Sequence, residues 1–140
     1  MHFVLDNSVV MRWLFADGSQ EAIDYSARIL DLLQHEDNAA AVPCVWALEV
    51  GNVIVRAEAK GVLQEARSAE FLGILQDMSI ETDPRSTTHA LGDTIQLARR
   101  YGLSTYDASY LELALREGLP LATNDQALRK ALAVAGGKLA

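Results

Sequence analysis

Residues 2–6 read HFVLD, an apolar run that ends in a carboxylate. An apolar run of this length, followed directly by polar residues, predicts a short β-strand that is buried on both faces. A carboxylate at the end of such a strand loses hydration free energy unless a helix N-terminus or a cation compensates for it. Asp6 is therefore expected either to cap the helix predicted over 8–15 or to belong to a functional site.

The same pattern recurs along the chain. Further short apolar runs are AAAV at 39–42, MSIE at 78–81 and LPLAT at 119–123. Segments of helical periodicity follow the strands and cover 8–15, 20–35, 44–59, 64–77, 87–101, 105–117 and 126–135. Alternating strands and helices predict a parallel sheet with helices on both faces. We therefore expect a three-layer α/β/α fold with a central parallel sheet of four or five strands.

The composition fits one domain over residues 1–140, because half of the residues are apolar and no linker or repeat interrupts the chain. No apolar run is long enough to span a bilayer, and the N-terminus lacks the features of a signal peptide, so we expect a cytoplasmic protein without membrane contact. The net charge of −7 argues against a broad basic surface for nucleic acids. Acids that bind divalent cations are neutralised, however, so local contact with RNA stays open.

Four acids fall at positions where this fold gathers ligands. In parallel α/β sheets, ligands bind beyond the carboxyl ends of the strands. Asp6 ends the first predicted strand, and Asp125 follows the fourth. Asp107 lies in the first turn of its predicted helix, and Glu49 lies in the second turn of another. The four carboxylates are therefore expected at one edge of the sheet.

Helix capping is the alternative explanation for three of these acids. Asp6 and Asp125 each precede a predicted helix, and Ser104 with Asp107 matches a capping box. Glu49 has no such explanation, because its neighbours are apolar and no Lys or Arg lies three or four residues away. The nearest polar side chain on the same helix face is Asn52, which carries no charge.

Together, the four acids favour a site for hard divalent cations. Without cations, neighbouring carboxylates would raise each other's pKa and lower the stability of the fold. Oxygen ligands suit Mg²⁺ or Mn²⁺. Zinc is disfavoured because Cys44 is the only cysteine and the histidines His2, His35 and His89 are scattered. These histidines are expected to be solvated or locally hydrogen-bonded.

The segments around the acids occur in a characteristic order. They are the strand that ends in Asp6-x-Ser8, LEVGNV at 48–53, YDASYLELA at 106–114 and TND at 123–125. In these segments the chain resembles a PIN-domain ribonuclease, and it is most similar to the VapC-type toxins of bacterial toxin-antitoxin pairs. The resemblance extends over nearly the whole chain.

The resemblance implies roles for particular residues. The catalytic and metal-binding acids of the family match Asp6, Glu49, Asp107 and Asp125. Asp6 and Asp107 match direct metal ligands. Asp125 would hold the metal through water, and Glu49 would bind or orient water.

Other polar residues are expected to support these acids or to contact the substrate. Ser8 and Thr123 match hydroxyl positions that hydrogen-bond the acids or bound water. Asn124 precedes the last acid, and Asn52 lies beside Glu49. Arg12 follows Asp6 in the first helix and is the basic residue expected to contact RNA.

The resemblance also implies an activity and partners. It implies hydrolysis of RNA phosphodiester bonds by an endoribonuclease that uses Mg²⁺ or Mn²⁺. It further implies neutralisation by a small VapB-type antitoxin, whose tail would lie across the acidic site, and a homodimer is expected. The apolar segments 13–15 and 53–55 are candidate contact surfaces.

Three other functions stay open from the residues alone. A haloacid-dehalogenase-like phosphatase also has an acid after its first strand, but it needs a second acid at the position of Ser8. A metal-dependent adhesion module would need Ser at the position of Val10. A non-catalytic PIN-like scaffold would bind metal or RNA without cleaving RNA, and a cleavage assay with EDTA separates it from an enzyme.

Overall fold

The computed structural model describes residues 1–140 and contains one sheet of four parallel strands in the order β3-β2-β1-β4. The strands are β1 (His2–Leu5), β2 (Ala39–Val42), β3 (Ile80–Thr82) and β4 (Leu121–Ala122). Phe3 lies opposite Ala40 of β2, and Val4 lies opposite Leu121 of β4. β1 is therefore a central strand, and Phe3, Val4 and Leu5 have no exposed surface.

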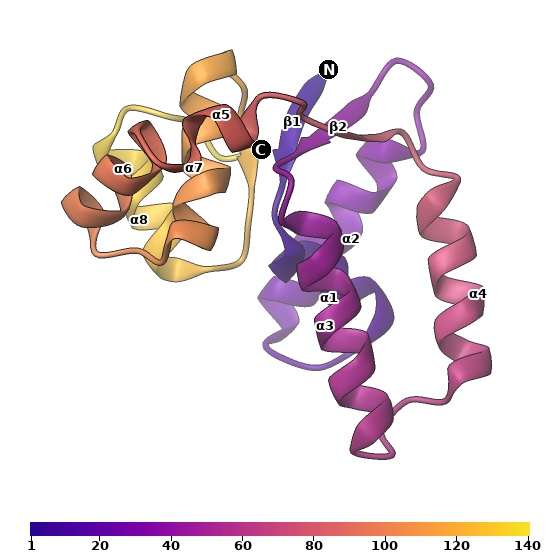
Figure 1. The fold of residues 1–140 in the computed structure, drawn as a ribbon. Coiled ribbons are helices and arrows are strands. Elements are labelled where there is room, and N and C mark those ends of the chain that lie inside the picture. Colours follow the sequence, from indigo (N-terminus) through magenta and orange to yellow (C-terminus); the bar gives the residue numbers. More distant parts are fainter.

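Eight helices cover the sheet. They are α1 (Asn7–Leu14), α2 (Gln20–Leu33), α3 (Trp46–Ala59), α4 (Glu65–Gln76), α5 (Ser86–Ala90), α6 (Asp93–Tyr101), α7 (Thr105–Glu117) and α8 (Gln126–Val134). Figure 1 shows α2, α3 and α4 on one side of β1 and β2, and α5, α6, α7 and α8 on the other side. This is the predicted three-layer α/β/α arrangement. None of the helices combines the length and apolar composition needed to cross a membrane.

The direction of strand addition reverses at β1. β2 and β3 follow on one side of β1, whereas β4 lies on its other side. In an open α/β sheet, the crevice outside the carboxyl ends of the strands at such a switch point is the usual place for a ligand. Residues 6–8 follow β1 and residues 123–125 follow β4, so the two segments meet at this crevice.

The helix predicted over 87–101 is interrupted in the structure. It divides into α5 and α6 at Leu91 and Gly92, where Gly92 has φ −118° and ψ −100°. The N–H of Gly92 donates to the carbonyl of His89 at 3.2 Å, which closes a turn. The other six predicted helices are present, with ends that shift by at most two residues.

Two strands are shorter than predicted. β4 starts at Leu121 because Pro120 has no N–H to donate to the sheet, and the N–H of Leu119 donates to the end of α7. β3 starts at Ile80 because the N–H of Met78 still belongs to the last turn of α4. The apolar pattern assigns Met78 and Leu119 to strands, but their N–H groups form hydrogen bonds with the end of the preceding helix.

Residues 138–140 take the place of a fifth strand. The N–H of Leu121 donates to the carbonyl of Lys138 at 2.9 Å, and the N–H of Ala140 donates to the carbonyl of Leu121 at 2.9 Å. Leu121 and Leu139 form an isolated parallel bridge. The outer edge of β4 is thus paired over a single bridge only.

Candidate acidic site

Asp6 follows β1 directly and lies at the switch point of the sheet. Its side chain is only 4% exposed. The hydroxyl of Ser8 donates to Oδ2 of Asp6 at 2.6 Å, and the hydroxyl of Thr123 donates to the same oxygen at 2.7 Å. Asp6 makes no side-chain hydrogen bond that caps α1, so capping does not explain this acid. The hydroxyls of Ser8 and Thr123 both donate to Oδ2 of Asp6, and neither donates to Oδ1.

The two hydroxyls also connect Asp6 to the segment that follows β4. Ser8 Oγ accepts the N–H of Asn124 at 2.9 Å, and Thr123 Oγ1 accepts the N–H of Asp125 at 3.0 Å. The amide of Asn124 donates to Ser26 Oγ of α2 at 2.8 Å. Each hydroxyl therefore accepts one backbone hydrogen bond and donates its proton to Asp6, which holds the two chain segments in a defined register.

Asp125 caps a helix and also lies near the other acids. Oδ1 of Asp125 accepts the N–H of Leu128 at 2.8 Å, so this oxygen caps α8. No hydrogen bond is formed by Oδ2. Burial is the main cause of the raised pKa of Asp6 and of Asp107, and the charge of Asp125 adds to it, so Asp125 lies within electrostatic reach of both acids.

Glu49 lies in the first turn of α3 and is partly buried. The hydroxyl of Tyr110 donates to Oε1 of Glu49 at 2.6 Å, and Tyr110 has no exposed surface. Asn52 is exposed and makes no hydrogen bond, so Tyr110 rather than Asn52 is the polar partner of Glu49. Sequence reasoning missed Tyr110, although it lies three residues after Asp107 and so shares its helix face.

Burial raises the pKa of Asp6, Glu49 and Asp107 above the ordinary carboxyl values. Charge repulsion adds to this effect: Asp6 and Asp107 raise the pKa of Glu49, and Asp6 and Asp125 raise the pKa of Asp107. The hydroxyl groups that donate to these acids lower the pKa values in part. Asp6 and Asp107 therefore lie within electrostatic reach of each other and of both Glu49 and Asp125.

The four acids have no basic partner. None of them forms an ion pair with Lys, Arg or His within 4.0 Å. No three of them place carboxylate oxygens all within 4.8 Å of one another. Mg²⁺ in proteins keeps several water ligands, so it does not need three carboxylate oxygens in direct contact. The donor set, oxygen atoms with uncompensated negative charge, fits a hard divalent cation.

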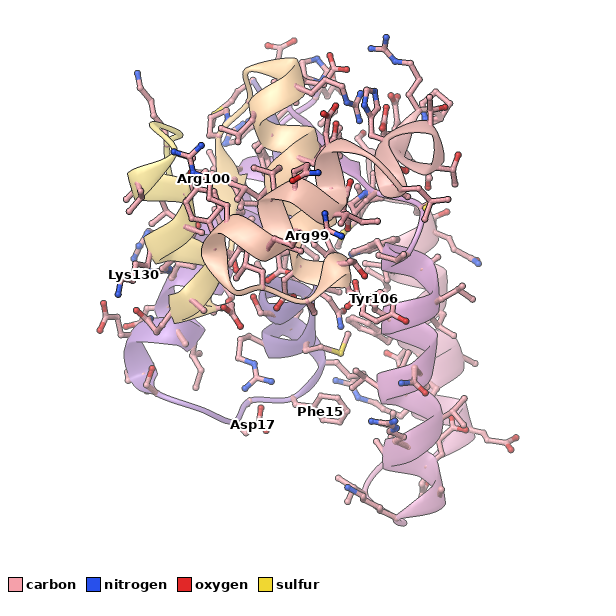
Figure 2. All side chains as sticks on the ribbon, turned by 60° about the vertical axis from the view of Figure 1, so that its left-hand side comes forward. Phe15, Asp17, Arg99, Arg100, Tyr106 and Lys130 are labelled. Carbon is pink, nitrogen blue, oxygen red and sulfur yellow. The ribbon has the colours of Figure 1, made fainter.

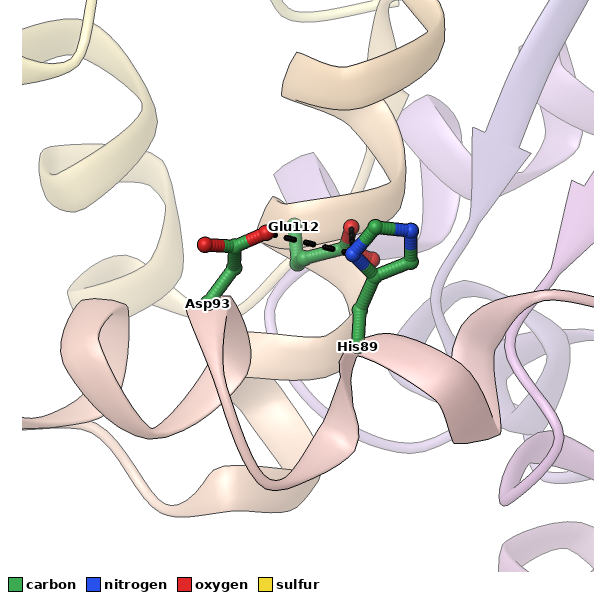
Figure 3. Close-up of side chains that lie close together, drawn as sticks. All are labelled: His89, Asp93 and Glu112. Carbon is green, nitrogen blue, oxygen red and sulfur yellow. Dashed lines mark hydrogen bonds and ion pairs between the residues drawn. The ribbon is translucent and has the colours of Figure 1, made fainter.

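A separate cluster on α5, α6 and α7 consists of His89, Asp93 and Glu112, whose metal-binding atoms do lie within 4.8 Å of one another (Figure 3). His89 Nδ1 lies 3.1 Å from Asp93 and 3.6 Å from Glu112. Both oxygens of Glu112 already accept hydrogen bonds from Arg116, at 2.6 and 3.1 Å. The positive charge of Arg116 already compensates Glu112, as a metal ion would, so we interpret the cluster as an ion-pair network. His89 is locally hydrogen-bonded, as the sequence analysis expects.

A groove with a volume of about 630 Å³ leads away from Asp125 between α1 and α3. Its walls include the apolar side chains Phe15 and Val53 and the basic side chains Arg12, Arg56 and Lys60. Arg12 Nη1 pairs with Asp17 at 2.6 Å. Figure 2 shows Phe15 and Asp17 at the lower edge of this region and Tyr106 higher up, beside α3. The groove thus joins the acidic site to a mixed apolar and basic surface.

Comparison with known proteins identifies the family. A family model described as PIN domain matches residues 3–132. The chain belongs to the PIN-domain family. Ribonuclease VapC3 of Pyrobaculum aerophilum is 32% identical over 82 residues, which is 59% of this chain and 63% of that protein. The matched part therefore spans less than two thirds of this relative.

Two solved structures share the fold. The crystal structure of PAE2754 from Pyrobaculum aerophilum has a TM-score of 0.66 at 22% identity, and the match covers 94% of this chain and 84% of that chain. The crystal structure of FitAcB from Neisseria gonorrhoeae has a TM-score of 0.60 at 17% identity, with 99% and 96% covered. At these identities the two structures support the fold alone.

Proposed function

We propose that this chain is a metal-dependent endoribonuclease that uses Mg²⁺ or Mn²⁺ to hydrolyse phosphodiester bonds of RNA in the cytoplasm. The main observation is the group of four acids without basic partners at the switch point of a PIN-domain sheet. The name of the related Ribonuclease VapC3 supports RNA as the substrate.

Each acid has a role that suits its surroundings. Asp6 and Asp107 would bind the cation directly, and Asp125 would hold it through water, because one oxygen of Asp125 caps α8. A bound divalent cation supplies a water molecule of lowered pKa and polarises the phosphate. Ser8 and Thr123 keep Asp6 in one orientation, which reduces the reorganisation that binding requires.

Glu49 would orient the attacking water. Tyr110 holds one oxygen of Glu49, so the other oxygen is available to accept a hydrogen bond from water. Burial and the neighbouring carboxylates raise the pKa of Tyr110 above its ordinary value, so its hydroxyl stays protonated as a donor. The pair therefore positions a water molecule at the acidic site.

The groove beside Asp125 suits the tail of a small VapB-type antitoxin, and we propose this chain as the toxin of such a pair. Phe15 and Val53 offer apolar contacts along the groove. An Arg of the tail would find the uncompensated carboxylates at its end. Arg12 lines the same groove and would contact RNA when the tail is absent.

We also propose a homodimer. Leu48 and Val55 on α3 are 77% and 63% exposed, and Ile74 on α4 is 52% exposed. Exposed apolar residues on neighbouring helices are typical of contact surfaces. Light scattering of the purified chain measures this: a molar mass twice that of the chain supports the dimer, and the monomer mass contradicts it.

A cleavage assay on total RNA tests the proposed enzyme. We expect cleavage with Mg²⁺ or Mn²⁺, no cleavage with EDTA, and no cleavage by Asp6→Asn or Asp107→Asn variants that keep the far-ultraviolet circular dichroism of the wild type. An unaltered rate in either variant would contradict the assigned ligands. RNA binding without cleavage would favour the scaffold, and hydrolysis of small phosphate esters without nuclease activity would favour the phosphatase.

A further inference from the structure

A second pocket, with a volume of about 260 Å³, lies between α2 and α8. Its lining includes Tyr25 and Arg28 from α2 and Gln126 and Arg129 from α8. Asn124 lines both this pocket and the larger groove beside Asp125. The pocket therefore adjoins the larger groove at Asn124.

Two arginines converge on one aromatic ring in this pocket. The guanidinium carbon of Arg129 lies 4.7 Å from the centroid of Tyr25, and that of Arg28 lies 5.5 Å from it. The hydroxyl of Tyr25 donates to the carbonyl of Ala140 at 3.1 Å, which fixes the position of the ring. Cation–π contact and this hydrogen bond hold both positive charges in place.

Neither arginine has a carboxylate partner. The chain has 19 acids and 12 basic residues, yet no ion pair is formed by Arg28 or Arg129 within 4.0 Å. Glu21 is the acid in the pocket lining, and it pairs with neither of them. Two like charges against one ring repel each other, and a bound anion would offset this repulsion.

The pocket is connected to Asp6 through a single residue. Nε of Arg129 donates to the carbonyl of Thr123 at 2.7 Å, and the hydroxyl of Thr123 donates to Asp6. The two Nη groups of Arg129 make no hydrogen bond and are available to a ligand. Arg28 is exposed and makes no hydrogen bond to the protein, so its whole guanidinium group is available.

We propose that Arg28 and Arg129 form a binding site for a backbone phosphate of the RNA strand next to the bond that is cleaved. Arg is suited to this task because its planar group donates two parallel hydrogen bonds to phosphate oxygens. The acidic site would hold the scissile phosphate with its cation, while this pocket holds a neighbouring phosphate without one. The inference rests on the proposed nuclease function.

The test measures binding of a short labelled single-stranded RNA to the Asp6→Asn protein in EDTA, where no cleavage occurs. We expect Arg28→Gln to weaken binding about tenfold. The slope of log affinity against log salt concentration should fall by about 0.7 for each phosphate that the protein no longer neutralises. Arg28→Lys keeps the charge and should keep most of the slope. Arg67→Gln is the matched control. Arg67 is exposed and lies on α4, which contributes no residue to the pocket, so this change should leave the RNA affinity and the salt slope unchanged.

Arg129→Gln should act in the same way, with thermal unfolding as a check because this variant also loses the bond to Thr123. Unchanged affinity and salt slope in Arg28→Gln would overturn the proposal. If Arg28→Gln weakens the binding of polyglutamate but leaves the affinity for RNA unchanged, the proposal is also overturned, and the pocket is assigned to an acidic protein segment. If the wild type cleaves RNA in a metal-dependent way but RNA binding does not depend on Arg28, the phosphate site is contradicted and the proposed nuclease function is not. If RNA binding depends on Arg28 but the wild type cleaves no RNA, the phosphate site is supported and the proposed nuclease function is contradicted.

Discussion

The hydroxyl of Tyr110 donates a hydrogen bond of 2.6 Å to Oε1 of Glu49 and so joins α7 to α3 across the acidic site. Asp107 lies on the same helix as Tyr110, three residues earlier. One helix therefore supplies both an acid and the donor that orients a second acid.

Replacement of Tyr110 by Phe tests this contact. The change removes one hydroxyl and leaves the ring in place, so we expect a loss of about 1–2 kcal/mol in the free energy of unfolding. Cleavage should slow by at least about tenfold, because Glu49 loses its fixed orientation. Tyr101→Phe is the control, since the hydroxyl of Tyr101 makes no hydrogen bond to the protein. Equal cleavage rates in the two variants would show that the contact is not needed.

Asp6→Asn should separate stability from activity. The variant keeps an oxygen that accepts from Ser8 and Thr123 but removes a buried charge that is repelled by neighbouring acids. In EDTA we expect its free energy of unfolding to rise by about 1 kcal/mol, while cleavage is lost. Mg²⁺ should raise the melting temperature of the wild type and not of the variant. A variant that is less stable than the wild type in EDTA would contradict this account.

The pH dependence of stability should change with metal. Burial, together with charge repulsion, raises the pKa of Asp6, Glu49 and Asp107 in the folded chain, so the folded chain binds more protons than the unfolded chain above about pH 4. The contribution of these acids is complete below their unfolded pKa values and is lost as pH rises through their folded values. In EDTA, the free energy of unfolding should therefore fall as pH rises from about 4.

Asp83 has the opposite effect on the pH dependence of the free energy of unfolding. Burial raises its pKa, but the hydrogen bond and charge of Arg116 outweigh this effect and lower the pKa below the ordinary value. Its contribution is present above the unfolded pKa and is lost as pH falls below about 4. Urea unfolding at several pH values, with EDTA and with Mg²⁺, measures both effects. Stability that rises with pH in EDTA above about pH 4 would contradict the assignment to the three acids.

The network around Arg116 should be structural. Arg116 donates to Glu112 and to Asp83 at 2.6 Å, and these carboxylates are only 4% and 8% exposed. Arg116→Ala removes the guanidinium partner of both buried carboxylates and leaves Glu112 only the 3.6 Å contact with His89, so it should lower the free energy of unfolding by about 3 kcal/mol. Arg85→Ala is the control, because Arg85 is 63% exposed in its pair with Glu117 and should cost less than about 1 kcal/mol. Similar effects of the two changes would contradict a structural role for the buried network.

The sequence predicts those parts of the site that depend on local position. Asp6 follows an apolar strand and Asp125 begins a helix, and both facts are visible in a few neighbouring residues. The parallel sheet then places strand ends together, which is a general property of alternating strands and helices. The fold class and the order of the helices follow from the same reasoning, except that the sequence predicts α5 and α6 as one helix.

Contacts between distant residues were not predictable in this way. Tyr110 and Glu49 are 61 residues apart, and Asp6 and Thr123 are 117 residues apart. A buried aromatic residue in a helix reads as core, and only the packing of α7 on α3 shows that its hydroxyl meets a carboxylate. The Arg28 and Arg129 pocket likewise depends on how α2 and α8 meet, and neither segment alone distinguishes these residues from ordinary surface charges.

The long separation between Asp6 and Thr123 has a consequence for synthesis of the chain. A nascent chain that has left the ribosome only as far as α7 contains Asp6, Glu49 and Asp107 but lacks β4, the hydroxyl of Thr123 and the acid of Asp125. The acidic site of the nuclease proposed here would therefore stay incomplete during translation until β4 and α8 had left the ribosome.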